Sequence, residues 1–129
     1  MQKKTGTVNT LLDALPFIKE FNKEIVVIKY GGSAQTSPKL KEKFAEDIVL
    51  MYLVGIKPVV IHGGGHKITD MLSALSIPTE FIEGQRVTTK EVMRIVEMIL
   101  SGEINKDIVS LLNSHGAKAI GISGKDAHF

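Results

Sequence analysis

The sequence contains no cysteine. Disulfide bonds, thiolate metal sites and a cysteine nucleophile are therefore excluded, and the absence fits a reducing cytosol. Long hydrophobic runs are also missing, because the longest, at residues 48–56, contains Tyr52 and Gly55 and is too short to span a bilayer. No apolar core of a signal peptide follows the lysines near the N-terminus. We expect a soluble, cytoplasmic protein with no membrane partner.

An excess of charge of one sign is missing too. Lysine and arginine total 16 against 14 for aspartate and glutamate, which gives a formal net charge of +2. No run of basic residues concentrates that surplus, so we expect no nucleic-acid partner. Apolar residues, in contrast, are plentiful. They make up 43% of the 129 residues, which is enough for the core of one domain.

Residues 1–22 have the pattern of an amphipathic helix. Apolar residues recur there at helical spacing: Val8, Leu11, Leu12, Leu15, Ile18 and Phe21. Pro16 lies inside this pattern, where it removes a backbone donor and clashes with the preceding turn. We therefore expect a kink or a restart of the helix at Pro16.

Strands that alternate with helices follow this segment. Two β-branched runs, 25–30 and 58–62, each end in glycines and predict buried strands. Between them, Ser37 is a candidate helix cap with Pro38 at the first helical position. Another helix is expected at 66–75, directly after the second glycine run.

The last part of the sequence continues the alternation. A short strand is expected at 79–83, and Thr88 with Glu91 predicts a capping box for the next helix. Gly102 is expected to interrupt that helix, a further helix follows, and residues 117–122 predict the last strand. The fold class is therefore α/β, with a mostly parallel open sheet and helices on both faces.

Glycines end both of the first two predicted strands, Gly31 and Gly32 after one and residues 63–65 after the other. Ligands of an open parallel sheet bind at its carboxyl edge. Glycines there let backbone amides approach an anion, and a helix N-terminus adds a favourable field. Two such loops can hold two anionic groups or the two ends of one transferring phosphoryl group. The alternative is that the glycines only turn the chain.

The familiar nucleotide motifs do not explain these loops. The triple glycine is followed by Ile68 where a dinucleotide fingerprint needs its third glycine. Gly124 and Lys125 are followed by Asp126, and Ala119 stands where a P-loop needs its first glycine. Both motifs fail.

Charged and histidine side chains stand beside the glycines. Lys29 ends an apolar strand, where a cation can neutralise a phosphoryl group, or can simply reach solvent. Arg86 follows Gly84 in a predicted loop, where its planar fork can bind a carboxylate, unless it is only solvated. His62 and His66 flank three glycines, which are incompatible with a helical zinc pair, so we expect no metal site.

Three segments taken together resemble the amino-acid kinase superfamily: KYGGS at 29–33, HGGGH at 62–66 and GQRVT at 84–88. Their order and spacing are most similar to those of the acetylglutamate kinase family. The resemblance runs from about Val8 to Asp126. The first two segments occur in variant form across the superfamily, whereas the third points to acetylglutamate kinases.

The resemblance implies transfer of a phosphoryl group from ATP, with Mg²⁺ on its phosphates, to the γ-carboxylate of N-acetyl-L-glutamate in arginine biosynthesis. It implies that Lys29 stabilises the transition state and that Arg86 grips the α-carboxylate of the substrate. A carboxylate is already ionised at neutral pH, so the reaction needs positioning and positive charge rather than a general base.

The resemblance also assigns the glycines. Gly31 and Gly32 would cradle the γ-phosphoryl group with backbone amides, and Gly64 and Gly65 would bind acetylglutamate and the transferring group. Residues 23–129 would be the substrate-binding N-terminal domain. Members of the family continue for about as many residues again, and that half carries most of the ATP site. The isolated chain is therefore expected to be inactive.

For residues 1–22 the resemblance implies a role in homo-oligomers. Arginine-sensitive members of the family carry a kinked N-terminal helix that links dimers into hexamers. The alternative is that the helix packs on its own domain. Two other hypotheses apply to the whole chain: a glutamate, aspartate or carbamate kinase, and a non-catalytic ligand-sensing or oligomerisation module of the same fold.

Overall fold

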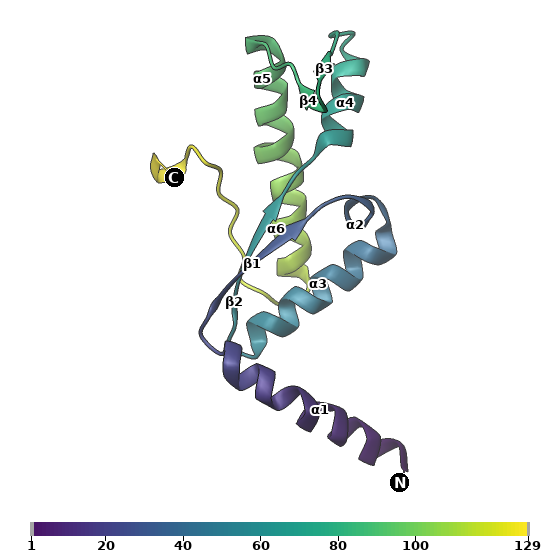
Figure 1. Cartoon of the computed structure of the whole chain (residues 1–129), viewed down its shortest axis with the longest axis vertical. Coiled ribbons are helices and arrows are strands. Elements are labelled where there is room, and N and C mark those ends of the chain that lie inside the picture. The colour runs from purple at the N-terminus through teal and green to yellow at the C-terminus, as the bar shows by residue number, and fades with distance from the viewer. Residues whose placement is uncertain (1, 129) are drawn as a thin grey trace.

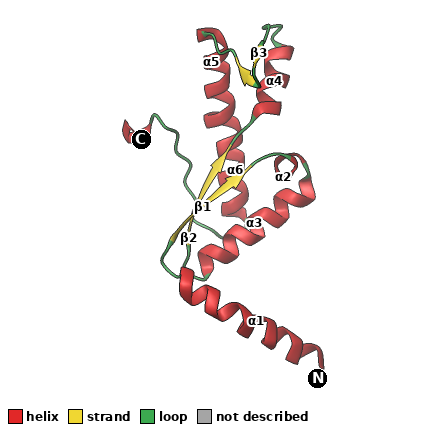
Figure 2. Cartoon of the chain, viewed as in Figure 1, coloured by secondary structure: helices red, strands yellow, loops and turns green. Residues whose placement is uncertain are grey.

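The computed structural model describes residues 2–128 of the chain. Helices and strands alternate through most of it (Figure 1, Figure 2), which confirms the α/β class. In chain order the elements are α1 (Gln2–Phe21), β1 (Ile25–Tyr30), α2 (Ser33–Thr36), α3 (Pro38–Leu53), β2 (Lys57–His62), α4 (Gly65–Ala74), β3 (Phe81–Ile82), β4 (Gln85–Arg86), α5 (Lys90–Glu97), the π-helix η1 (Met98–Ile104), α6 (Asn105–Ser114) and the 3-10 helix η2 (Asp126–His128).

β1 and β2 form a parallel pair that is connected through α2 and α3. Their register pairs Ile25 with Lys57 and Tyr30 with His62, so both strands end at the same edge. Their β-branched residues favour strands because branched side chains pack well on a pleated surface. A parallel pair needs a long crossover, which α3 supplies, and Ser37 caps that helix through its side chain. Both predicted strands and the predicted cap are confirmed.

The core lies between one face of this sheet and the helices that follow the strands. Tyr30 at the end of β1 stacks on Phe44 of α3, with ring centroids 3.8 Å apart. The Tyr30 hydroxyl donates to the Ala34 carbonyl at 2.9 Å, and burial raises the pKa of Tyr30. This packing fixes the strand end from which the first glycine loop leaves. The buried apolar residues are Tyr30, Ala45, Ile48, Val49, Ile68, Leu72, Val92, Ile99, Ile104, Ile108 and Leu112.

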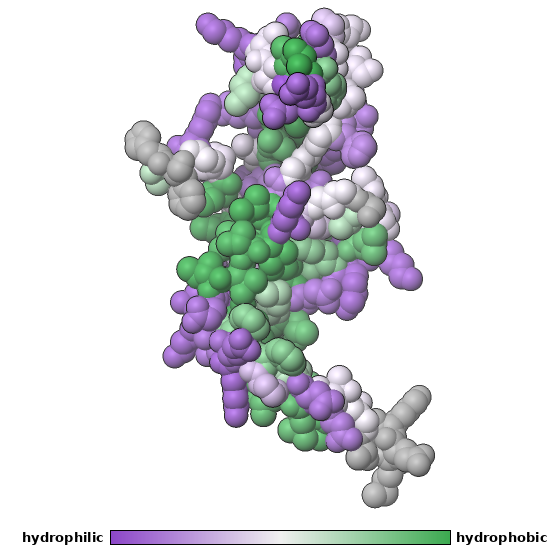
Figure 3. Space-filling model, in the orientation of Figure 1, coloured by the Kyte–Doolittle hydropathy of each residue, from purple (hydrophilic) through white to green (hydrophobic). Residues whose placement is uncertain are grey.

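The other face of the sheet is uncovered. Ile25, Val27, Val59 and Ile61 alternate with the inward-facing positions and are 45–66% exposed. Apolar side chains gather over the strands in Figure 3. The helices within residues 2–128 therefore cover one face of the β1–β2 pair. None of these helices covers the second face, where helices were also predicted.

Residues 117–122 are not a strand, and that prediction is wrong. Side chains of α6 hold their backbone instead. Asn113 Oδ1 accepts from the Ala119 N–H at 2.7 Å, and Asn105 Nδ2 donates to the Ile122 carbonyl at 3.3 Å. A cavity of about 580 Å³ lies between this segment, β2 and α6. The apolar pattern indicated an extended backbone, but β2 is not its partner.

One long helical stretch occupies the second half of the chain. α5, η1 and α6 follow one another without a break, so Gly102 does not interrupt the helix as predicted. The stretch widens instead into the π-helix η1, a form that is frequent at functional sites. The helix cap is Thr89, whose hydroxyl accepts from the Val92 N–H at 3.2 Å. The capping box predicted from Thr88 and Glu91 is therefore wrong by one residue.

β3 and β4 form a tight antiparallel hairpin that pairs Phe81 with Arg86. The two turn residues, Glu83 and Gly84, have φ angles of 49° and 79°. Positive φ at both central residues suits the twist of a two-residue hairpin, and glycine adopts it without strain. The strand predicted at 79–83 is thus present in shorter form. Arg86 lies on a strand rather than in a loop, which corrects its predicted location.

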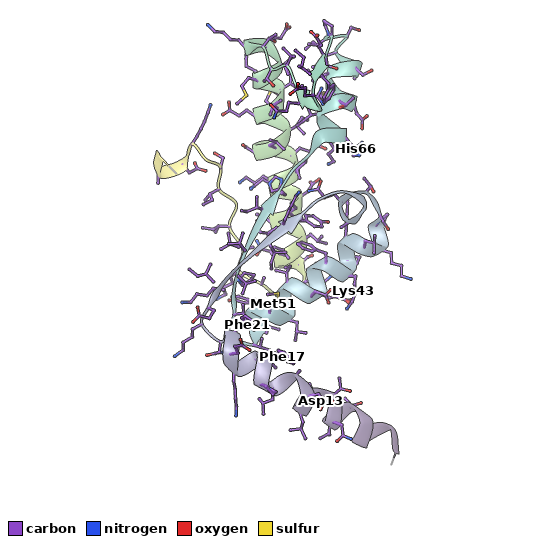
Figure 4. The ribbon with its side chains drawn as sticks, in the orientation of Figure 1. Asp13, Phe17, Phe21, Lys43, Met51 and His66 are labelled. Atoms are coloured by element: carbon purple, nitrogen blue, oxygen red, sulfur yellow. The ribbon has the colours of Figure 1, made fainter. Side chains whose placement is uncertain are left out.

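α1 projects from the rest of the molecule (Figure 1). It runs unbroken through Pro16, so a restart is absent. Phe17 and Phe21 stand out from this helix in Figure 4. No helix within residues 2–128 is both long enough and apolar enough to cross a membrane. The large apolar residues of α1 that are 40–62% exposed are Val8, Leu11, Leu12, Leu15, Phe17 and Phe21.

Candidate functional site

The two glycine loops lie side by side at the carboxyl edge of the sheet. Because Tyr30 and His62 are register partners, the glycines after each strand leave from the same edge. A single side chain ties the loops together. The amide nitrogen of Gln35 donates to the carbonyls of Tyr30 and Gly63, both at 3.1 Å. A side-chain amide has two N–H donors, so both bonds form at once and hold the loops in one relative position.

A cavity of about 480 Å³ opens at these loops, a size typical of small-molecule sites. α2, α4 and α6 contribute the other walls. His66 in Figure 4 marks the start of α4, where the second loop becomes helical. The structure therefore brings together all predicted site residues except Arg86. Those that line the cavity are Lys29, Gly31, Gly32, Gly64 and Gly65.

The first loop leaves an open space beside its backbone. Gly32 turns the chain with a φ of 61°, a conformation that favours glycine. A Cβ added at Gly31 or Gly32 would meet nothing within 4 Å. Lys29 lies next to this space at the end of β1, and no carboxylate of residues 2–128 forms an ion pair with it. The loop can thus admit an anion beside a positive charge that no carboxylate of the described residues pairs.

The second loop is packed tightly on one side and open on the other. A Cβ at Gly64 would collide with Cδ1 of Ile104 and would lie 2.9 Å from Cδ2 of Leu100, both on the π-helix η1. Close packing, rather than backbone strain, therefore disfavours a side chain at Gly64, whose φ is −172°. At Gly65, in contrast, a Cβ would meet nothing within 4 Å. η1 thus supports the loop, and Gly65 leaves room for a ligand.

Ion pairs also anchor α4 to the long helical stretch. Lys67 Nζ lies 2.6 Å from Glu103 Oε1 and 3.2 Å from Asp107 Oδ2. The hydrogen bond to Glu103 raises the pKa of Lys67. Lys67 therefore lines the cavity as a charged but already paired group, and it was not singled out in the sequence.

Arg86 lies beside the cavity rather than in its lining. Its Nη2 donates to the Thr69 hydroxyl at 2.7 Å, and its Cζ lies 4.5 Å from the centroid of the Phe81 ring. The other terminal nitrogen, Nη1, is buried and has no hydrogen-bond partner within residues 2–128. Thr69 in turn donates from its hydroxyl to the Gly65 carbonyl at 2.9 Å. One side chain therefore connects Arg86 to the second glycine loop.

Sequence reasoning missed the residues that support the site. Thr69 follows Gly65 by four positions, which is one helical turn, and that spacing was the only available signal. The contact of Phe81 with Arg86 depends on the hairpin, which was predicted only in part. Gln35 carries no pattern that distinguishes it from a solvated polar residue.

His62 and His66 flank the second loop, and His62 Nδ1 lies 3.3 Å from the Gly63 carbonyl oxygen. In the part of the chain that the structure describes, no three side chains of histidine, aspartate or glutamate gather as a metal-binding group.

Comparison with known proteins relates the chain to one protein family. The model of the amino acid kinase family matches residues 24–129. A curated relative from Sulfurimonas denitrificans, named acetylglutamate kinase, is 80% identical over 129 residues, which are 100% of this chain and 46% of the relative. A second relative of the same name, from Nitratiruptor sp., is 73% identical over 129 residues and is covered to 45%. The chain thus spans about half the length of the curated relatives it matches.

A solved structure supports the fold independently. N-acetylglutamate synthase from Neisseria gonorrhoeae, complexed with coenzyme A and N-acetyl-glutamate, matches with a TM-score of 0.69 at 23% identity. The match covers 84% of this chain and 25% of the synthase chain. At that identity the likeness concerns the fold alone.

Proposed function

Because the chain belongs to the amino acid kinase family, we propose that it is the substrate-binding part of a longer enzyme that phosphorylates N-acetyl-L-glutamate. The enzyme transfers the γ-phosphoryl group of ATP to the γ-carboxylate of this substrate, a step of arginine biosynthesis, in the cytoplasm. The names of the relatives that are 60–80% identical support this substrate. The chain alone is expected to be inactive, since it spans about half of those relatives.

The observation that carries the proposal is the pair of glycine loops held at one sheet edge beside Lys29. Phosphoryl transfer to a carboxylate brings several negative charges together, so positioning and positive charge supply most of the catalysis. Gly31 and Gly32 offer backbone amides and open space to the transferring phosphoryl group. Lys29 supplies charge that is unpaired within residues 2–128.

The residues present fit the phosphate end of a nucleotide. The open space beside Gly31 and Gly32 is a cradle that a Cβ would narrow, and Gly65 stands at the N-terminus of α4, where anions are favoured. ATP would be bound with Mg²⁺, which neutralises part of its phosphate charge. Lys29 would balance the charge that remains on the transferring group.

Arg86 is proposed to hold the α-carboxylate of the substrate. Its buried Nη1 lacks a partner within residues 2–128, and a buried donor without an acceptor costs about 1–3 kcal/mol. A carboxylate oxygen would satisfy Nη1, while the guanidinium lies over the ring of Phe81. Gly64 and Gly65 would contact the same substrate from the second loop.

α1 is proposed to join copies of the enzyme into a homo-oligomer. Residues 1–22 form the oligomerisation segment, and residues 23–129 form the substrate-binding domain. An apolar stripe on an amphipathic helix has to be buried, and the stripe of α1 is exposed in the described chain. A second copy can supply the same stripe, because two-fold contacts are self-complementary.

Calorimetric titration tests both the proposed substrate and the proposed carboxylate clamp, Arg86. The longer enzyme should bind acetylglutamate more tightly than glutamate or aspartate. Arg86→Lys should weaken that binding at least tenfold, because lysine cannot make two parallel hydrogen bonds. Arg94→Lys changes the one other arginine of the sequence and is the matched control. Equal affinities for the three ligands, or an unaffected Arg86→Lys variant, would contradict the assignment.

A further inference from the structure

The Thr69 hydroxyl occupies a position between two groups of the proposed site. It donates to the Gly65 carbonyl at 2.9 Å and accepts from Arg86 Nη2 at 2.7 Å. A hydroxyl has one hydrogen, and here that hydrogen points to the carbonyl. A lone pair of the same oxygen is therefore presented to the guanidinium. The Thr69 hydroxyl is thus the donor to the Gly65 carbonyl and the acceptor from Arg86.

The guanidinium of Arg86 is held in two directions by these neighbours. Cζ of the guanidinium lies over the Phe81 ring, 4.5 Å from its centroid, and such a contact does not by itself fix the rotation of the guanidinium over the ring. The bond to Thr69 fixes that rotation because it is directed at one nitrogen. The rotation matters, because it sets the direction in which Nη1, which has no hydrogen-bond partner within residues 2–128, points.

We propose that Thr69 is a positioning residue that orients Arg86 toward the second glycine loop and thereby raises the affinity for the carboxylate of the substrate. This inference rests on the proposed function. Thr69 does not itself touch the reacting atoms. Its hydroxyl links the Gly65 carbonyl to the Arg86 guanidinium by two hydrogen bonds. The second glycine loop and Arg86 are thereby held in one relative position and form one binding surface.

The proposed role predicts a particular kinetic signature. A group that fixes the orientation of the clamp acts equally on the bound substrate and on the transition state, so its loss raises KM and leaves kcat nearly unchanged. Hydrogen bonds to charged groups are the stronger ones in proteins. Because the effect of Thr69 is indirect, we expect KM for acetylglutamate to rise about five- to tenfold on its loss.

The test compares hydroxyl-bearing and hydroxyl-free variants in the longer enzyme. Thr69→Val keeps the shape of the side chain and removes the hydroxyl, whereas Thr69→Ser keeps the hydroxyl and should restore KM. Thr10→Val is the matched control, since the Thr10 hydroxyl makes the same bond to a carbonyl four residues earlier, at 3.1 Å, but in α1. The dissociation constant of acetylglutamate from calorimetry should follow KM in every variant.

A double-mutant cycle separates positioning from a general structural effect. In an Arg86→Ala background Thr69→Val should have no further effect on KM, because the group that Thr69 orients is gone. Thermal unfolding checks that each variant folds, and Thr69→Ala replaces Thr69→Val in the cycle if the valine variant does not.

Two kinds of failure are distinguishable. If the wild-type enzyme binds acetylglutamate and Thr69→Val leaves KM within twofold, or lowers kcat instead, the positioning role is wrong and the proposed function stands. If Thr69→Val raises KM by the same factor in the Arg86→Ala background as in the wild type, the positioning role is also wrong and the proposed function stands. If the wild-type enzyme does not bind acetylglutamate, the proposed function is wrong, and the role of Thr69 falls with it.

Discussion

Gly64→Ala is the substitution that most sharply tests how the second glycine loop is supported. Gly64 has a φ of −172°, which alanine can adopt, so backbone strain does not exclude a side chain there. The obstacle is packing. The new Cβ would collide with Cδ1 of Ile104, a residue that is 5% exposed, and would lie 2.9 Å from Cδ2 of Leu100. The ends of these two side chains, η1 or the loop therefore has to shift.

The expected loss in the free energy of unfolding follows from that overlap. Forcing one methyl group into a packed core costs about 1–3 kcal/mol. Replacing glycine by alanine also restricts the unfolded chain, which returns about 0.4–1 kcal/mol. We therefore expect Gly64→Ala to lower the free energy of unfolding by about 1–2 kcal/mol. Gly65→Ala is the control, because its Cβ would meet nothing within 4 Å, and its effect on stability should be near zero or favourable.

Urea unfolding with a compensating substitution measures this cost directly. Ile104→Val removes the Cδ1 atom that the new methyl would strike, at a cost of about 0.5–1.5 kcal/mol on its own. In the double variant the two costs should not add. It should be more stable than the sum of the single effects by about 1 kcal/mol. Additive costs, or a Gly64→Ala variant as stable as the wild type, would refute the packing argument.

Three further predictions concern charge, assembly and pH. Lys29→Ala should lower kcat of the longer enzyme by about 100-fold or more with a smaller change in KM, since its charge acts mainly in the transition state; steady-state kinetics that show the reverse split would contradict this role. Deletion of residues 1–22 should leave a folded, active dimer that has lost a larger assembly and any response to arginine; light scattering that finds an unchanged mass, or aggregate, would mean that α1 belongs to the core. The pKa of Lys67 is raised by Glu103, so the pair stabilises the folded state below the ordinary lysine value of 10.5, and this contribution is lost as pH rises through the folded pKa. Because the pair is partly exposed, Lys67→Met should cost no more than about 1 kcal/mol at pH 7 and less at pH 11, and a constant difference in urea unfolding would refute the linkage.

The parts of the fold that follow local rules were predictable. β1 and β2 are β-branched runs that end in glycines, and parallel strands bring their carboxyl ends to one edge. The sequence therefore predicts that Lys29 and the glycine loops of the cavity lie at one edge of the sheet. The Ser37 cap of α3 was predictable for the same reason, since capping depends on a few neighbouring residues.

The parts that depend on tertiary partners were not. Residues 117–122 have the composition of a strand, but their backbone bonds to Asn105 and Asn113 of α6, and no local signal shows which partner prevails. Gly102 lies in a helix that continues as a π-helix, because burial of neighbours such as Ile104 outweighs the low helix propensity of glycine.

Arg86 shows most clearly what the sequence alone could not predict. Its place in the sequence suggested a carboxylate clamp in a loop, whereas the structure puts it on β4. The contacts that would orient it come from Thr69 and Phe81, which are 17 and 5 positions away. Only the pairing of the hairpin and the packing of α4 bring them together.

The most direct test of the central claim is an assay for acyl phosphate, trapped as a hydroxamate, with ATP, Mg²⁺ and one carboxylate substrate at a time. The longer enzyme should form the hydroxamate from acetylglutamate in clear preference to glutamate and aspartate, and the isolated 129-residue chain should form none. Preference for glutamate or aspartate, no product from acetylglutamate, or turnover by the isolated chain would contradict the account.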